Sequence, residues 1–192
     1  MFLSVSETPC PRGKGFCFLG DVMALRLLDI DRDLEAFHRF LSDFESVKYM
    51  MQPPVESKDE TLAMLTRWTK GYEDTSWAIY DPPEMDTLGR ISMFRSEDGV
   101  WEVGVMLLPE ARGRGLAADA VIEAMRQTFS LKDTDLIRAD IDPENLASVR
   151  VFERIGYVKT GYDKGNVTTH IGLRDSVYFE MTRGAFEARY GA

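Results

Sequence analysis

Residues 101–108, WEVGVMLL, followed by Pro109 and then by RGRGLA at residues 112–117, decide the fold. Successive side chains of an extended WEVGVMLL segment point to opposite sides, as in a strand, and the proline ends that strand. From about residue 115 to residue 129, apolar residues recur at helical spacing. The stretch therefore predicts a strand, a glycine-rich turn and a helix in direct succession.

The glycine-rich turn has the features of a diphosphate site. Gly113 and Gly115 can adopt unusual torsions and let the backbone approach a ligand closely. The N–H groups of the first helical turn carry partial positive charge, and Arg112 and Arg114 add full charges. A tight turn that needs its glycines only for geometry is the alternative. The P-loop pattern is absent, and the late position of the turn disfavours a dinucleotide-binding oxidoreductase.

Strands and helices are predicted on both sides of this centre. Helix start signals occur at Asp31 or Asp33 and at the capping-box pair Ser57 and Glu60. Further strands are predicted at residues 24–28, 77–80, 88–94, 136–141, 157–161 and 177–181, and a further helix at residues 146–155. The fold class is therefore α/β in the mixed α+β sense, a mixed sheet with helices on its faces.

Length and charge limit the possible functions. A chain of 192 residues is ordinary for one domain. We expect residues 1–22 to form an irregular or hairpin-like extension and residues 23–192 to form the single domain. The net charge of −9 without a basic run disfavours a nucleic-acid partner and suits a small cationic substrate.

Cysteine usage and hydropathy add further expectations. Cys10 and Cys17 lie in a Pro/Gly-rich stretch with too few neighbouring ligands for zinc, and a disulfide between them would close a small loop. No metal site is predicted. No apolar stretch is long enough for a membrane span, and the start lacks the basic region of a signal peptide. We expect a soluble, cytoplasmic protein.

Five short motifs occur in a fixed order: EVG at 102–104, proline at 109, RxxGxA at 112–117, NxxS at 145–148 and ERIGY at 153–157. This ordered set resembles the acyl-CoA-binding half of the GNAT acetyltransferase superfamily, and most closely its RimJ/RimL-like branch. The resemblance is best over residues 101–161, looser over 23–100 and absent over 1–22. It implies the GNAT fold, a central, twisted, mostly antiparallel sheet flanked by helices.

The resemblance also implies acetyl-CoA as cosubstrate. In the family, the RxxGxA loop holds the CoA pyrophosphate, and the preceding strand binds the pantetheine arm. Transferred residue by residue, this implies that CoA is contacted by Met106, Leu107, Leu108, Arg112, Gly113, Arg114, Gly115, Leu116, Ala117, Asn145, Ser148 and Phe152.

Catalytic roles are assigned more narrowly. Many members have a tyrosine that protonates the departing thiolate where this chain has Phe152, so Ser148 is the nearest hydroxyl that matches a motif. Asn145 is expected to cap the helix that follows it and to touch the pantetheine or an active-site water. Glu102 is the best candidate for the base that deprotonates the amine through water, with Asp140 and Asp142 as weaker candidates.

A backbone amide in residues 106–108 would meet the thioester oxyanion. The two histidines, His38 and His170, have no matching motif, and we expect both at or near the surface.

The sequence thus predicts an acetyl-CoA-dependent N-acetyltransferase. The acetyl group would pass by direct attack to a primary amine, either a protein N-terminus or a small molecule, and the enzyme would be a monomer or homodimer. An aminoglycoside-type N-acetyltransferase is one alternative, because residues 177–187 are similar to the tail of some of those enzymes. A non-catalytic acyl-CoA-binding module is another, because Phe152 has no hydroxyl.

Overall fold

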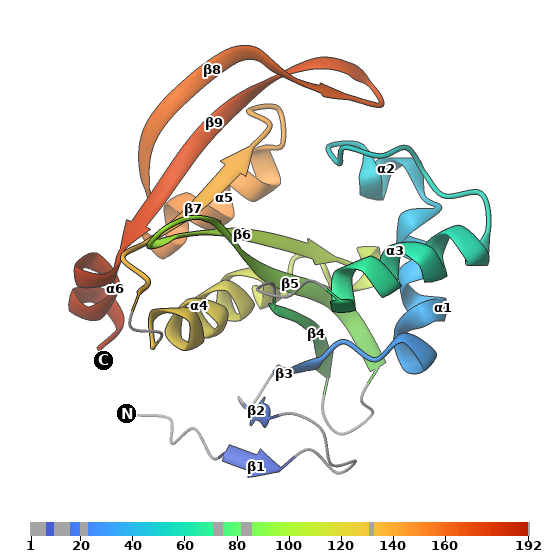
Figure 1. Cartoon of the computed structure of the whole chain (residues 1–192), viewed down its shortest axis with the longest axis horizontal. Helices are drawn as coiled ribbons and strands as arrows, with labels where there is room; N and C mark the ends of the chain where they lie inside the picture. The colour runs from blue at the N-terminus through green and yellow to red at the C-terminus, as the bar shows by residue number, and fades with distance from the viewer. Residues whose placement is uncertain are drawn as a thin grey trace.

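One sheet runs through the whole molecule (Figure 1). The computed structural model describes residues 7–9, 16–19, 23–70, 75–81, 86–130 and 133–191. Within these residues the sheet has nine strands in the order β1-β2-β3-β4-β5-β6-β7-β9-β8. The strands are β1 (Glu7–Pro9), β2 (Phe16–Leu19), β3 (Ala24–Leu27), β4 (Thr75–Asp81), β5 (Asp86–Glu97), β6 (Val100–Leu107), β7 (Leu136–Ile141), β8 (Val158–Thr169) and β9 (Gly172–Thr182).

The expected extension contributes an antiparallel pair of strands. β1 pairs antiparallel with β2, and β2 pairs antiparallel with β3, so these two strands extend the sheet beyond β3. The rest of residues 1–22, with Cys10 among them, lies outside the described residues.

Helices pack on the sheet in two separate hydrophobic cores. Helix α4 (Leu116–Phe129) and helix α5 (Leu146–Ile155) share the larger core with the sheet and with the C-terminal helix α6 (Arg183–Tyr190). Helix α1 (Ile30–Leu41), the short α2 (Phe44–Val47) and α3 (Lys58–Lys70) surround the smaller core. A 3-10 turn, η1 (Pro109–Ala111), lies between β6 and α4. No described helix is both long and apolar enough to cross a membrane.

Helix α1 begins earlier than its sequence suggested. Asp29, rather than Asp31 or Asp33, is the N-cap and accepts a hydrogen bond from the Arg32 N–H. Asp33 is instead fully buried, where it binds Arg26 at 2.5 Å. Burial of a carboxylate is tolerated only with such a partner, so the aspartate that pairs with arginine could not stay at an exposed cap.

Helix α3 follows its predicted start signal. The Glu60 N–H donates to the Ser57 hydroxyl at 3.2 Å, and the Glu60 carboxylate accepts from the Glu56 N–H at 3.0 Å. The first bond satisfies an N–H of the first helical turn that would otherwise lack a partner, and the second fixes the segment that enters the helix.

The C-terminal part differs most from expectation. β8 and β9 form a hairpin that is longer than the strands predicted at 157–161 and 177–181. In Figure 1 this hairpin arches beyond the other strands of the sheet. Helix α6 was not predicted.

The sheet separates between β6 and β7. These two strands run parallel and pair only from Val100 with Leu136 to Glu102 with Arg138. Beyond this point β6 continues to Leu107 and β7 to Ile141. β6 keeps its partner β5 on one side, so its other edge presents backbone N–H and C=O groups to the gap.

Candidate active site

A cleft of about 740 Å³ occupies the gap between β6 and β7. Its lining includes the turn that contains Gly113 and Gly115, together with α5. Residues 103–107 of β6 and 139–142 at and just after the end of β7 also line it, as do Phe40 of α1 and residues of α2 at the α1–α2 end. The cleft therefore connects the α4–α5 side of the sheet with the α1–α2 side.

The glycine turn has an open space beside it. Gly113 and Gly115 have φ angles of 78° and 84°, which favour glycine. A Cβ atom added at either position would meet no atom within 4 Å. The N–H groups of Leu116 and Ala117 belong to the first turn of α4, where a helix supplies no acceptors. The turn could therefore hold the diphosphate of CoA.

The hydrogen bonds of the Arg112 side chain do not fit a simple phosphate-binding role. Its Nε donates to the Leu107 carbonyl at 3.2 Å, and its Nη2 donates to the Ser46 hydroxyl of α2 at 2.8 Å. The guanidinium thus links the glycine turn to α2 while it lines the cleft.

The residues expected along the pantetheine arm divide into two groups. Met106 and Leu107 line the cleft. Leu108 is buried in the smaller core, and its N–H donates to the Leu88 carbonyl at 2.8 Å. The Leu116 side chain is likewise buried, in the larger core, so this residue can offer a ligand only its backbone.

Helix α5 brings the motif residues to the cleft. Asn145 caps the helix, accepting the Ser148 N–H at 3.2 Å, which confirms the predicted capping role. Asn145, Ser148 and Phe152 all line the cleft. The Phe152 ring packs edge-on against Tyr157 at 5.0 Å, and the Tyr157 hydroxyl donates to the Met125 sulfur in the core. The tyrosine near this helix is therefore turned away from the cleft.

The three candidate carboxylates have different surroundings. Asp140 lines the cleft, whereas Glu102 is not among the lining residues and belongs to the last β6–β7 pair. Burial raises the pKa of the Glu102 carboxyl, and the nearby Asp140 charge raises it further. Loss of solvation within the cleft walls likewise raises the pKa of Asp140 above the usual aspartate value, and Asp163 adds to the effect. Asp142 is ion-paired with Arg174 at 2.7 Å.

The opposite end of the cleft is formed by residues that the sequence did not point to. They come from α1 and α2, from the segment after α2 and from β5, and no motif marks any of them; they are Phe40, Glu45, Ser46, Tyr49, Met50 and Arg90.

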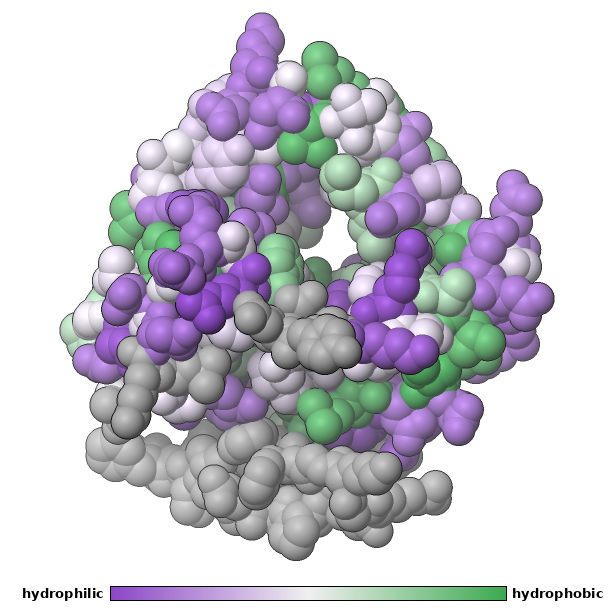
Figure 2. Space-filling view, viewed as in Figure 1, coloured by the Kyte–Doolittle hydropathy of each residue, from purple (hydrophilic) through white to green (hydrophobic). Residues whose placement is uncertain are grey.

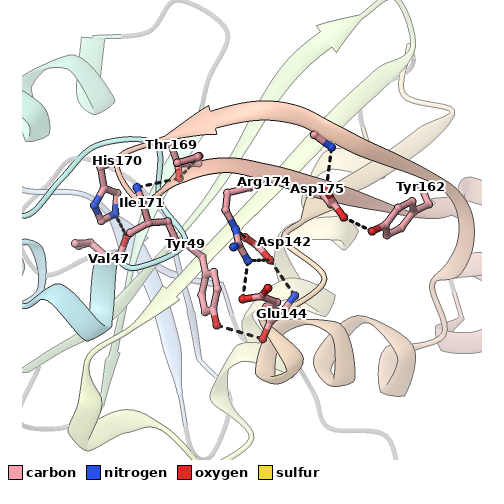
Figure 3. A network of polar contacts seen from close by, with 12 residues as sticks. Val47, Tyr49, Asp142, Glu144, Tyr162, Thr169, His170, Ile171, Arg174 and Asp175 are labelled. Atoms are coloured by element: carbon pink, nitrogen blue, oxygen red, sulfur yellow. Dashed lines mark hydrogen bonds and ion pairs between the residues drawn. The ribbon is translucent and has the colours of Figure 1, made fainter.

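The two histidines lie at contacts between elements. His170, expected at the surface, is half-buried at the tip of the β8–β9 hairpin, with its Nε2 at 3.1 Å from the Val47 carbonyl of α2 (Figure 3). His38 is half-buried between α1 and α3, with Nδ1 at 2.9 Å from the Thr61 hydroxyl. His170 thus lies near the surface as expected, but it takes part in a long-range contact that the sequence did not indicate.

A family model described as an acetyltransferase (GNAT) domain matches residues 23–158. The chain belongs to the GNAT acetyltransferase family. It is similar to YnaD of Bacillus subtilis, an uncharacterized N-acetyltransferase, at 24% identity over 151 residues, 78% of this chain and 88% of the relative. It is also similar to spermidine N(1)-acetyltransferase of Vibrio cholerae, at 20% identity over 132 residues, 68% of this chain and 76% of the relative.

Solved structures share the fold. A GNAT-family acetyltransferase from Bacillus anthracis superposes with a TM-score of 0.78 at 22% identity, covering 86% of this chain and 98% of that one. The Vibrio cholerae spermidine N-acetyltransferase in complex with CoA and spermine superposes with a TM-score of 0.76 at 18% identity, covering 87% and 99%.

This GNAT acetyltransferase is therefore an enzyme, an N-acetyltransferase that uses acetyl-CoA. The alternative of a non-catalytic acyl-CoA-binding module is not upheld. The described residues contain no group of three or more His, Cys, Asp or Glu side chains that could hold a metal ion.

Proposed function

We propose that the enzyme transfers the acetyl group of acetyl-CoA to the primary amine of a small molecule. The observation that carries the proposal is the cleft itself, which runs from the glycine turn through the β6–β7 gap to α1 and α2. CoA would enter from the glycine turn and the amine from the α1–α2 side, so that the two reactants meet in the gap. The Vibrio cholerae spermidine N-acetyltransferase, which shares the fold and forms a complex with both CoA and spermine, supports this arrangement.

The reaction is direct attack of a neutral amine on the thioester. A carbon–nitrogen bond forms as the carbon–sulfur bond breaks, the amine proton passes to a carboxylate, and the CoA thiolate leaves and takes up a proton. A free N–H on the open edge of β6 would stabilise the oxyanion. Ser148 lines the cleft beside Asn145 and is the proposed hydroxyl near the departing sulfur.

We assign the base to Asp140, with Glu102 as the second carboxylate behind it. Of the acidic residues that line the cleft, Asp142 is held by two hydrogen bonds from Arg174, and Glu45 belongs to α2 rather than to a strand that borders the gap. Asp140 is left on the strand that borders the gap. The raised pKa of the Asp140 carboxyl suits a base, because a carboxylate with a higher pKa takes the proton more readily from the attacking amine nitrogen.

Three finer assignments belong to the same proposal. The RxxGxA and NxxS motifs favour the RimJ/RimL-like branch. The net charge of −9 favours an acceptor other than nucleic acid. A cytoplasmic location agrees with the use of acetyl-CoA.

A thiol-release assay with acetyl-CoA tests the proposal. The acceptors are a panel of aliphatic amines, aminoglycosides and peptides with free N-termini. We expect turnover with at least one small amine and less with the peptides. Thiol release with none of the small amines would overturn the proposal, and turnover with peptides alone would move the acceptor to a protein N-terminus.

A further inference from the structure

The tip of the β8–β9 hairpin reaches across the molecule to α2. The His170 Nε2 lies 3.1 Å from the Val47 carbonyl, and because a carbonyl can only accept, this nitrogen is the donor. The His170 ring also meets the Phe44 ring edge-on, with centroids 5.8 Å apart. We call these two interactions the tip contact; its histidine appears beside Val47 in Figure 3.

A second set of contacts joins the same two parts closer to the cleft. The Tyr49 hydroxyl, just after α2, donates to the Glu144 carbonyl at 3.2 Å. Arg174 of β9 binds the carboxylates of Asp142 and Glu144, each at 2.7 Å (Figure 3). The hairpin, the end of β7 and the segment after α2 are thus connected through Tyr49, Glu144 and Arg174.

These contacts therefore border the α1–α2 end of the cleft. Tyr49 and Asp142, which belong to this connected set, also line the cleft. Figure 2 shows an opening through the molecule beneath the arch of the hairpin, with side chains on every side of it. An acceptor that reaches the gap through such an opening must fit the cross-section of the opening, since side chains in folded proteins are close-packed and yield little.

We propose that the tip contact, through His170 and Phe44, makes this enzyme select unbranched aliphatic primary amines that enter end-on, and exclude amines carried on bulky ring systems. The inference rests on the proposed function, because it concerns the acceptor of the same cleft. The carboxylates of Glu45 and Asp140 along the cleft suit an acceptor with a positively charged amino group.

Selectivity between two acceptors tests the proposal. The value of kcat/KM is measured with acetyl-CoA for 1,4-diaminobutane and for kanamycin, in the wild type and in His170→Ala and Phe44→Ala. The wild type is expected to prefer the diamine at least about tenfold, the order that steric exclusion from a pocket gives. Each variant is expected to lower this preference about tenfold, mainly by a rise for kanamycin, with an unchanged KM for acetyl-CoA.

His38→Ala is the matched control, because it removes the other histidine from a contact between α1 and α3. It should keep the wild-type preference. Since Phe44 is 47% exposed, its truncation should leave the fold intact, which circular dichroism checks.

The outcomes separate the two proposals. A wild type that acetylates neither amine nor any other small amine overturns the proposed function and this inference with it. Two results would overturn this inference and leave the proposed function standing. One is a wild type with equal kcat/KM for the two amines, and the other is a tip-contact variant that changes kcat/KM for both amines by the same factor.

Discussion

The two ends of the cleft are built in different ways. At the CoA end, the contacts are local: Asn145 caps the helix that carries Ser148, and the two glycines directly precede α4. At the acceptor end, the bonds from Tyr49 to Glu144 and from His170 to Val47 join residues 95 and 123 positions apart. The difference separates the proposed cosubstrate site, which is encoded in one stretch, from the proposed acceptor site, which is assembled by tertiary contacts.

Substitutions at the two ends of the cleft should have different kinetic effects. A change at the CoA end should affect the KM for acetyl-CoA and reduce turnover of every acceptor by the same factor. A change at the acceptor end should leave the KM for acetyl-CoA unaltered and change the ranking of amines.

The largest effect is expected where α1 is anchored to the sheet. Asp33→Ala should lower the free energy of unfolding by about 3–5 kcal/mol, because it leaves the buried Arg26 guanidinium without its carboxylate. Urea denaturation measures the loss. Asp31→Ala, an exposed aspartate in the same first turn, is the control and should cost less than about 1 kcal/mol. Equal losses in the two variants would contradict a structural role for the buried pair.

The next effect concerns the base in the gap between the two ends. Asp140→Asn should lower kcat about 100-fold with every acceptor, within the range expected for loss of a general base. Glu102→Gln should have a smaller effect. Thiol release under saturating acetyl-CoA measures both.

The pH profile distinguishes the two carboxylates. A base acts when ionised, so kcat/KM of the wild type should rise with pH through a pKa that lies above the usual aspartate value, because partial loss of solvation raises the pKa of Asp140. This limb should disappear in Asp140→Asn and persist in Glu102→Gln. The reverse result would assign the base to Glu102.

A smaller effect is expected at the glycine turn. Gly115→Ala and Gly191→Ala both place a Cβ on a residue with positive φ, which should cost each about 1–2 kcal/mol of stability in thermal or urea unfolding. Only Gly115→Ala should also raise the KM for acetyl-CoA, by about tenfold, because Gly115 precedes the amides of α4. A similar KM in both variants would place the diphosphate elsewhere.

The smallest effect is expected at helix caps. Asn145→Ala and Thr182→Ala each remove a side chain that accepts an N–H at the start of a helix, and each should cost about 1 kcal/mol. Asn145→Ala should in addition lower the affinity for CoA in a titration, whereas Thr182→Ala, at α6, should not. Unchanged CoA affinity in both variants would limit Asn145 to capping.

Much of the CoA end could be predicted from the sequence. The predicted strand 136–141 and helix 146–155 coincide with β7 and α5, and α4 begins one residue after Gly115. These elements have local signals, namely alternation, helical spacing, a proline stop and caps, and each signal acts within a few residues.

The acceptor end could not be predicted in the same way. Phe44 lies just beyond the end of α1 at Leu41, and it belongs to α2, which begins after an N-cap at Asp43. His170 stood in a polar stretch that gave no reason to expect a contact with Val47. Tyr49 carries no motif. Each of these residues acquires its role from a partner that is remote in sequence, and periodicity does not report such partners.

The sequence by itself determined the strand–turn–helix around Gly113 and Gly115 and hence the family, because local backbone torsions and unpaired helix amides depend on adjacent residues. Tertiary structure alone decided that β6 and β7 separate after three residue pairs and that the β8–β9 hairpin meets α2. The physical reason is that packing between distant segments depends on how whole elements fit together, so the shape of the acceptor passage exists only in the folded chain.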